Sequence, residues 1–318
     1  MAESRIQQSE IFHFVSRNQH ELLANQQHSQ ANVSIHRKSG FGKTAISKFL
    51  SEPITVIWLI VLILIVGAAI IGPLIIHYDP NHIDAALQNQ APSFAHFFGT
   101  DKLGRDLFVR TCTGLQVSLL VAIVSTILSI VFGTVYGVIM AVAGGWVDEV
   151  MMRIIEIFNS IPSLLITMIL MAVLGNGIVA LLFAIAITSW ADAARQTRGL
   201  VMQLRNLDYV TAAKMLDTPF WRTTTRHFVP NMMSILILDI GQSIPDNIFA
   251  EASLSFLGLG LQPPNTSLGI LISVGQDQML QHPYQLYVPI IVLILLVLAF
   301  NIVGDGVRDA LDPKYQDK

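Results

Sequence analysis

The chain has 318 residues, of which 53% are hydrophobic and only 13% are charged. Soluble domains carry about 25% charged residues, and the apolar residues here gather in long runs, which indicates a membrane protein. The net charge of −3 gives no indication of a nucleic-acid partner, and none is expected. The single cysteine, Cys112, excludes an internal disulfide and a thiolate metal cluster.

Residues 1–50 are polar and are predicted to form an N-terminal extension. Their pattern allows a short helix over 5–16, and the remainder is expected to be mobile. Gly40–Thr44 has a faint likeness to a phosphate-binding loop, but Arg37 stands where that loop requires glycine. The chain is therefore not expected to bind ATP or another cofactor. The first 30 residues fit no secretory signal, so the first apolar run is expected to be an uncleaved anchor.

Six apolar runs are long enough to cross about 30 Å of hydrocarbon, the fourth only just. They lie at residues 54–77, 116–142, 153–174, 178–194, 231–255 and 286–304. Gly133 and Gly137 in the second run have a spacing that lets a neighbouring helix approach closely. Pro162 predicts a kink or a re-entrant bend in the third. The sequence thus predicts an all-α integral membrane protein with a five-helix core at 116–306.

The polar segment at 78–115 follows the first span. Metal binding by His96, Asp101 and Asp106 is conceivable, but their spacing matches no known ligand pattern. A hydrogen-bonded turn is therefore preferred, and no metal site is predicted. Arg105 stands between the two aspartates and indicates local charge pairing.

The Lys and Arg residues are distributed unevenly about these spans. Six spans put both termini on one side, and that side holds 16 of the 19 Lys and Arg residues. Because positive residues accumulate on the cytoplasmic side, the extension, the loop at 195–230 and the tail at 307–318 are predicted to be cytoplasmic. The segments at 78–115 and 256–285 are then extracytoplasmic.

Residues 207–230, here called the 207–230 loop, interrupt the apolar second half with polar sequence. Local signals predict two short helices. Asp208 is suited to cap the first helix, while Thr218 and Pro219 begin the second and Pro230 ends it. Two short helices between two spans are expected to form a compact cytoplasmic projection to which another protein can bind.

The 207–230 loop resembles the coupling loop of ABC importer permeases, whose pattern is Glu-Ala-Ala, then Gly, then Arg-His-x-x-Pro. The matching residues are Ala212, Ala213, Leu216, Arg226, His227 and Pro230. Thr211 and Asp217 depart from the pattern, because the family usually has Glu and Gly there. Thr211 cannot complete a capping box, and Asp217 in a left-handed turn costs roughly 1 kcal/mol. Weaker coupling than the family norm is expected, and a surface loop that matches by chance is the alternative for this stretch alone.

Further motifs resemble the second membrane subunit of dipeptide, oligopeptide and nickel ABC importers. They lie at 98–106, 144–153, 158–165, 251–264 and 299–313, and the fourth, EASLSFLGLGLQPP, is nearly word for word. The resemblance covers roughly residues 54–315, with a departure at 265–268, and leaves out the extension at 1–50.

The resemblance implies six transmembrane helices in the type I ABC importer permease fold. The chain would be a non-catalytic subunit that forms a pathway for peptides, nickel or another solute with a second homologous permease. Two cytoplasmic ATPase subunits would hold ATP and Mg²⁺, and an extracytoplasmic binding protein would deliver the solute. The complex would lie in the lipid bilayer of a bacterial cytoplasmic membrane.

Four residues of the 207–230 loop are suited to a protein interface. Ala212 and Ala213 let a partner surface approach closely, and Phe220 and Trp221 are of the types that dominate interface energy. The alternative for Trp221 is a place in the aromatic belt at the membrane interface.

Four polar residues within predicted spans are candidates for lining the pathway: Asn159, Asp239, Asp246 and Glu251. Ionisable residues in a span are costly and often functional. At 100° per residue, Asp239 and Asp246 lie nearly two turns apart on one face. Three interpretations stay open: lining of a polar pathway, which is preferred, fixing of helix contacts, and proton coupling.

Two other classes of protein are therefore alternatives. A secondary transporter would move protons through Asp239, Asp246 and Glu251, and would lose uptake with an uncoupler and not on ATP depletion. A membrane-embedded enzyme would need a convergent nucleophile or metal set, which the sequence does not offer.

Overall fold

A computed structural model describes residues 41–311 in two units, Met1–Ser51 and Glu52–Lys318. The residues not described within that range are 77, 206, 208, 209, 211–214, 216–218, 220, 221, 223, 225–227 and 263, together with the side chains of 41–45, 231 and 234. In the described part of the chain the regular elements are all helical, which confirms the all-α prediction.

The first unit contains one described helix, α2 (Phe41–Ser51). The sequence analysis did not predict a helix for these residues. Ala45, Ile46, Phe49 and Leu50 recur at helical spacing, a signal that the overall polarity of the extension concealed.

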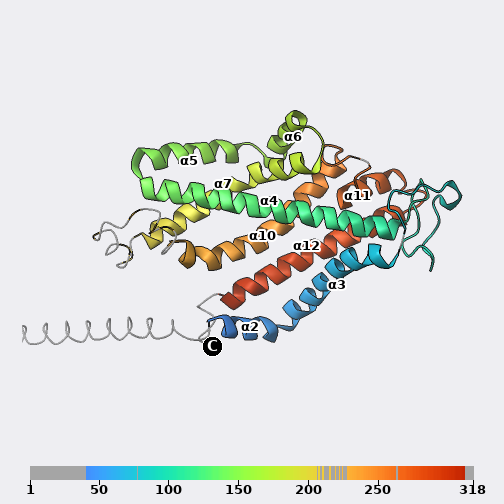
Figure 1. The fold of residues 1–318 in the computed structure, drawn as a ribbon, viewed down its shortest axis with the longest axis horizontal. Coiled ribbons are helices and arrows are strands. Elements are labelled where there is room, and N and C mark those ends of the chain that lie inside the picture. Colours follow the sequence, from blue (N-terminus) through green and yellow to red (C-terminus); the bar gives the residue numbers. More distant parts are fainter. Residues whose placement is uncertain are drawn as a thin grey trace, which may run out of the picture. The chain divides into compact units, whose positions relative to one another are not determined.

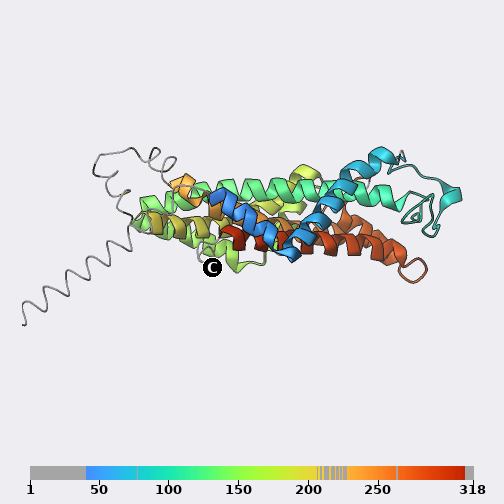
Figure 2. The same cartoon turned by 90° about the horizontal axis from the view of Figure 1, so that it is seen from below.

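The second unit is a helical bundle (Figure 1). Its elements are α3 (Pro53–Ile75), the short 3₁₀ helix η1 (Ala85–Leu87), α4 (Leu107–Ala143), α5 (Gly145–Ser160), α6 (Ser163–Leu174), α7 (Ile178–Leu204), α10 (Val229–Phe256), α11 (Leu268–Asp277) and α12 (Tyr284–Leu311). Helices α4, α7, α10 and α12 run lengthwise in both views of the ribbon (Figure 1, Figure 2).

The described residues contain four helices that are long and apolar enough to cross a membrane: α3, α4, α7 and α12. The bent pair α5–α6 makes a fifth candidate if it counts as one span. Helix α10 has 28 residues but contains Asp239, Asp246 and Glu251, and it is not among these candidates. Length and composition therefore support four or five of the six predicted spans.

The long helices extend past the predicted apolar runs. Helix α4 begins at Leu107 because the side chain of Asp106 accepts a hydrogen bond from the backbone N–H of Val109 at 2.9 Å. Its 37 residues reach about 55 Å, well beyond the hydrocarbon thickness. Helix α7 likewise continues to Leu204, ten residues past the predicted end at 194.

The predicted bend at Pro162 is confirmed. Helices α5 and α6 meet at 90° across Ile161 and Pro162. Ile161 is extended, at φ −102° and ψ 131°, as expected for a residue that precedes proline.

Helices α4 and α7 pack closely against each other. A Cβ atom on Gly133 would lie 2.7 Å from the carbonyl oxygen of Trp190, and one on Gly137 would lie 2.8 Å from the Cβ of Thr197 and overlap the carbonyl oxygen of Ala194. The close approach predicted from the spacing of the two glycines is confirmed. Close packing at these two glycines therefore joins α4 to α7.

Candidate functional site

Of the 24 residues of the 207–230 loop, 15 lie outside the described residues. Its predicted interface residues Asp208, Thr211, Ala212, Ala213, Leu216, Asp217, Phe220, Trp221, Arg226 and His227 all fall there. Their role therefore stays a prediction. The structure describes the two helices that flank the loop, α7 and α10, and a few positions between them.

Both edges of the 207–230 loop are fastened to the bundle. Val210 and Phe228 are buried in one hydrophobic cluster with Val201 and Met232. At the end of α7, the guanidinium of Arg205 donates to the carbonyl oxygen of Ala141 in α4, at 3.0 Å. A displacement of the loop would therefore be transmitted to α4, α7 and α10.

Helices α5, α7 and α10 bring four polar side chains together. The amide of Asn159 in α5 donates to a carboxylate oxygen of Asp192 in α7 at 3.2 Å. One turn along α7, Gln196 hydrogen-bonds Asp239 of α10, which also lies close enough to Asp192 for an electrostatic interaction. The structure thus joins Asn159 and Asp239, two predicted candidates, through two residues that the sequence analysis missed. The signal was their i, i+4 spacing across the end of the apolar run at 178–194.

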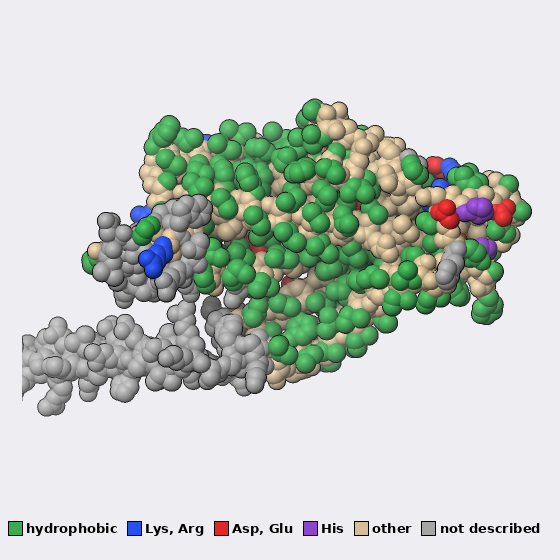
Figure 3. Space-filling view, viewed as in Figure 1, with side chains coloured by type: hydrophobic (Ala, Val, Ile, Leu, Met, Phe, Trp, Pro, Cys, Tyr) green, Lys and Arg blue, Asp and Glu red, His purple; other side chains and the backbone are tan. Residues whose placement is uncertain are grey.

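Further polar side chains follow along α10. Asp246 and Gln242 are exposed, and Asp239 is partly buried. Asp192, Gln196 and Asn159 are also exposed in the single chain. We call these six residues the polar face. It differs from the outer sides of the bundle, where hydrophobic side chains cover much of the surface drawn in Figure 3.

Glu251 lies apart from the polar face, because it is fully buried. Its carboxylate accepts hydrogen bonds from the hydroxyls of Ser118 at 2.6 Å and Ser255 at 2.7 Å. Ser267, which caps α11, is a third hydroxyl partner. These contacts join α4, α10 and the beginning of α11, which is the geometry of a helix joint.

A second buried polar joint lies between Glu251 and the polar face. The amide of Asn247 donates to the hydroxyl of Thr126 in α4 at 2.8 Å, and its oxygen accepts from Ser189 in α7 at 3.1 Å. Asn247 is 3% exposed. It therefore fixes α10 against the α4–α7 pair.

The segment before α4 contains the predicted hydrogen-bonded turn. The carboxylate of Asp101 accepts from the backbone N–H of Leu103 and Arg105 and from the guanidinium of Arg105 at 2.7 Å, which confirms the local charge pairing. Asp106 pairs with His96 at 2.7 Å. Among the described residues no group of three His, Cys, Asp or Glu side chains is arranged to hold a metal ion.

The sequence matches known transport proteins over most of its length. The family described as binding-protein-dependent transport system inner membrane component matches residues 133–317, and the N-terminal TM domain of oligopeptide transport permease C matches residues 40–92.

Individual relatives cover the chain more fully. The oligopeptide transport system permease protein OppC of Bacillus subtilis (strain 168) is 39% identical over 86% of this chain and 90% of its own length. The dipeptide transport system permease protein DppC of the same organism is 36% identical over 93% of each chain. OppC of Escherichia coli (strain K12) is 39% identical over 84% of this chain and 89% of its own length. The chain therefore belongs to the family of binding-protein-dependent transport system inner membrane components.

Proposed function

We propose that this chain and a second, homologous permease subunit form the translocation pathway of an ABC importer for dipeptides or oligopeptides. Two cytoplasmic ATPase subunits, which hold ATP and Mg²⁺, would drive the import, and an extracytoplasmic binding protein would deliver the peptide. The relatives reported above, which are named as oligopeptide and dipeptide permeases, support this substrate class. The 207–230 loop would be the contact with one ATPase subunit.

The polar face is the observation that best supports this proposal. Asp192 and Gln196 are exposed on α7, a candidate span. Asn159 is exposed on α5, which is a candidate span together with α6. Polar and ionisable groups at membrane depth are costly when they face lipid, and they normally face a bundle interior or a water-filled cavity. The second permease subunit would cover this face and leave a polar pathway between the two chains.

This arrangement makes α10 a span despite its carboxylates, since Asp239 and Asp246 would face the pathway and not lipid. The six spans would then be α3, α4, the bent pair α5–α6, α7, α10 and α12. Both termini and the 207–230 loop would be cytoplasmic, as the distribution of Lys and Arg indicates. The 78–115 and 256–285 segments would receive the binding protein on the other side of a bacterial cytoplasmic membrane.

Transport measurements test the proposed function. The chain, its partner permease, the two ATPases and the binding protein would be reconstituted in proteoliposomes and given labelled trialanine. Uptake that requires both ATP and the binding protein, and that persists with a proton uncoupler, is expected. Uptake that an uncoupler abolishes, with no need for ATP, would instead establish the proton-coupled alternative.

Replacing Asp239 by leucine is expected to lower ATP-dependent peptide uptake at least fivefold. The variant removes the partner of Gln196 and places an apolar side chain on the polar face. Uptake and the amount of assembled complex would be measured together. Glu156→Gln, which neutralises an exposed carboxylate on α5 outside the polar face, is the control and is expected to keep normal uptake. Equal uptake by both variants would remove Asp239 from the pathway.

The departures at Thr211 and Asp217 predict a gain of function. Thr211→Glu would restore the capping box, and Asp217→Gly would relieve a left-handed turn that costs roughly 1 kcal/mol. Each variant is expected to raise the peptide taken up per ATP hydrolysed about twofold. No change in either would show that the departures are compensated elsewhere in the complex.

A further inference from the structure

Helix α5 is attached to α4 through a pair of glycines. Gly144 and Gly145 have φ angles of +61° and +52°, a backbone conformation that side chains disfavour and glycine accepts. The chain reverses there, so that α5 runs back along the bundle (Figure 1). Two adjacent glycines make this connection a pivot, and contacts farther along α5 must set its angle.

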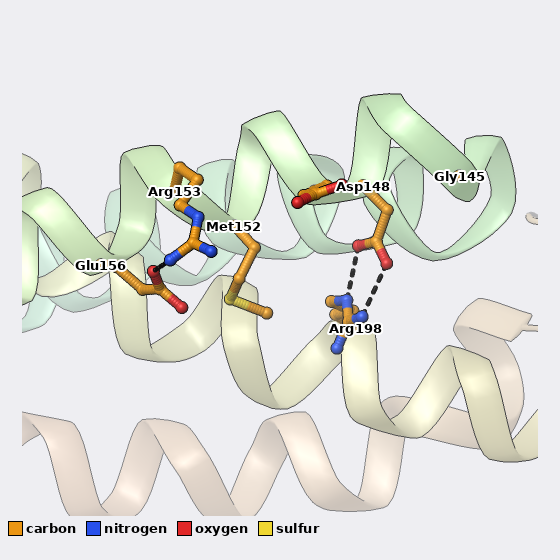
Figure 4. A pocket seen from close by; sticks show the side chains of 7 residues that line it. Gly145, Asp148, Met152, Arg153, Glu156 and Arg198 are labelled. Carbon is orange, nitrogen blue, oxygen red and sulfur yellow. Dashed lines mark hydrogen bonds and ion pairs between the residues drawn. The ribbon is translucent and has the colours of Figure 1, made fainter.

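One of those contacts is an ion pair between Asp148 of α5 and Arg198 of α7. Both oxygens of the Asp148 carboxylate accept from the guanidinium, through Nε and one terminal nitrogen, each at 2.6 Å (Figure 4). A bidentate pair of this kind fixes direction as well as distance. The two side chains are 17% and 25% exposed, so water screens the pair less than a fully exposed one.

Open space surrounds the ion pair. The side chains drawn in Figure 4 line a hollow of about 240 Å³ between α5 and α7. The hydroxyl of Tyr136 in α4 also donates a hydrogen bond to the carbonyl oxygen of Met151, at 3.0 Å. Farther along α5, Ile155 is fully buried in a hydrophobic cluster with Trp190 and Ala194 of α7. The ion pair is therefore the polar contact between α5 and α7 at the glycine end of α5, where the hollow leaves it room to change.

Arg198 is well placed to receive movement from the cytoplasmic end of α7. A Cβ on Gly137 of α4 would lie 3.0 Å from the backbone nitrogen of Arg198, so α4 and α7 are in close contact at that residue. Arg205, two turns further, ties the end of α7 to Ala141. A movement of the segment of α7 that leads into the 207–230 loop is therefore expected to reach Arg198.

The far end of α5 carries Asn159, which contacts Asp192 on the polar face. The helix has 16 residues and is about 24 Å long, so a small rotation at the glycine pair becomes a displacement of several ångströms at Asn159. The bend at Pro162 then passes the displacement to α6.

We infer that Asp148 and Arg198 are positioning residues for transport, which hold α5 to α7 so that movement of the cytoplasmic end of α7 displaces Asn159 at the polar face. The inference rests on the proposed function, because it needs a transporter in which ATP hydrolysis moves that end of α7.

The test compares single variants with a charge exchange in the complete reconstituted transporter. Asp148→Asn and Arg198→Gln are each expected to lower the trialanine taken up per ATP hydrolysed at least fivefold. Exchange of the two residues, Asp148→Arg with Arg198→Asp, is expected to restore the ratio to within twofold of wild type. A purely structural role would lower uptake and hydrolysis together with the amount of complex, and would leave the ratio unchanged.

The matched control is the other ion pair in Figure 4. Arg153 and Glu156 are 2.7 Å apart, lie in the same helix and are 70% and 48% exposed, so they join no two helices. Arg153→Ala is expected to keep the trialanine taken up per ATP hydrolysed within twofold of the wild-type value. Arg198→Lys keeps the charge and loses the bidentate geometry, so a two- to fourfold decrease in the trialanine taken up per ATP hydrolysed is expected. This variant provides the test if Asp148→Asn and Arg198→Gln fail to assemble.

Three results would overturn the inference. The first is a wild-type ratio in the assembled Asp148→Asn and Arg198→Gln variants, or in Arg198→Lys where those two do not assemble. The second is a charge-exchange variant that assembles but does not restore the trialanine taken up per ATP hydrolysed. The third is a wild-type complex without ATP-dependent uptake, which would overturn the proposed function as well; the first two leave that function intact.

Discussion

Replacing Gly137 by leucine is expected to prevent α4 and α7 from packing and to leave little folded permease in the membrane. A Cβ at this position would overlap the carbonyl oxygen of Ala194 and lie 2.8 Å from the Cβ of Thr197 and 3.0 Å from the backbone nitrogen of Arg198. Two of these neighbours are backbone atoms, which cannot rotate away. Overpacking of a core costs about 1–3 kcal/mol for smaller intrusions, and we expect the leucine to exceed the upper end of that range.

The smaller variant Gly137→Ala gives a graded measurement. It should lower the midpoint of thermal unfolding in detergent, with a cost of about 1–3 kcal/mol, although alanine is intrinsically favoured in a helix by up to about 1 kcal/mol. Gly199 in α7 is the matched control, because no atom of the described residues lies within 4 Å of a Cβ built there. Gly199→Ala should raise the midpoint. A shift of the same sign in both variants would show that intrinsic helix propensity, and not close packing, decides the effect at Gly137.

The sequence predicted this contact because small residues at a spacing of four mark a close helix crossing. It also predicted the bend at Pro162, since proline in a helix interior removes a hydrogen bond and clashes with the preceding turn. Both features depend on local chemistry that one stretch of chain contains in full.

Hydropathy alone could not predict where the helices end. It detects the apolar part of a helix, whereas α4 begins at Leu107 because Asp106 caps it, and α7 continues through Gln196 beyond the predicted run. The sequence analysis therefore overlooked Gln196, and it also overlooked Asp192 near the end of that run. For the same reason it missed α2, whose apolar residues have helical spacing within a polar extension.

The candidate pathway residues show a second limit. The cost of charge in a span singled out Asp239, Asp246 and Glu251 alike. What separates them is a tertiary contact: Ser118, which donates to Glu251, stands 133 residues away in the chain. No local pattern could indicate that hydroxyl groups enclose one of the three carboxylates while the other two lie on the polar face.

Glu251→Ala is expected to destabilise the folded permease by about 3–5 kcal/mol. The variant leaves a cavity and removes the acceptor of the buried Ser118 and Ser255 hydroxyls, and an unsatisfied buried donor costs about 1–3 kcal/mol in addition to the cavity. Glu251→Gln keeps the volume and one acceptor oxygen. A serine hydroxyl can rotate to accept from the new amide, so this variant should cost only about 1 kcal/mol.

The matched control is Asp246→Ala, which truncates an exposed acidic side chain five residues earlier in α10. Its effect on the unfolding midpoint should be small, about 0.5 kcal/mol or less, while peptide uptake per assembled complex should fall because Asp246 belongs to the polar face. Glu251→Gln should show the opposite pattern, with a lowered midpoint and near-normal uptake per assembled complex. A Glu251→Gln complex that is stable but transports no peptide would contradict a purely helix-joining role for Glu251. It would place Glu251 in the pathway, because only a carboxylate with a direct role in transport would be so sensitive to an isosteric amide.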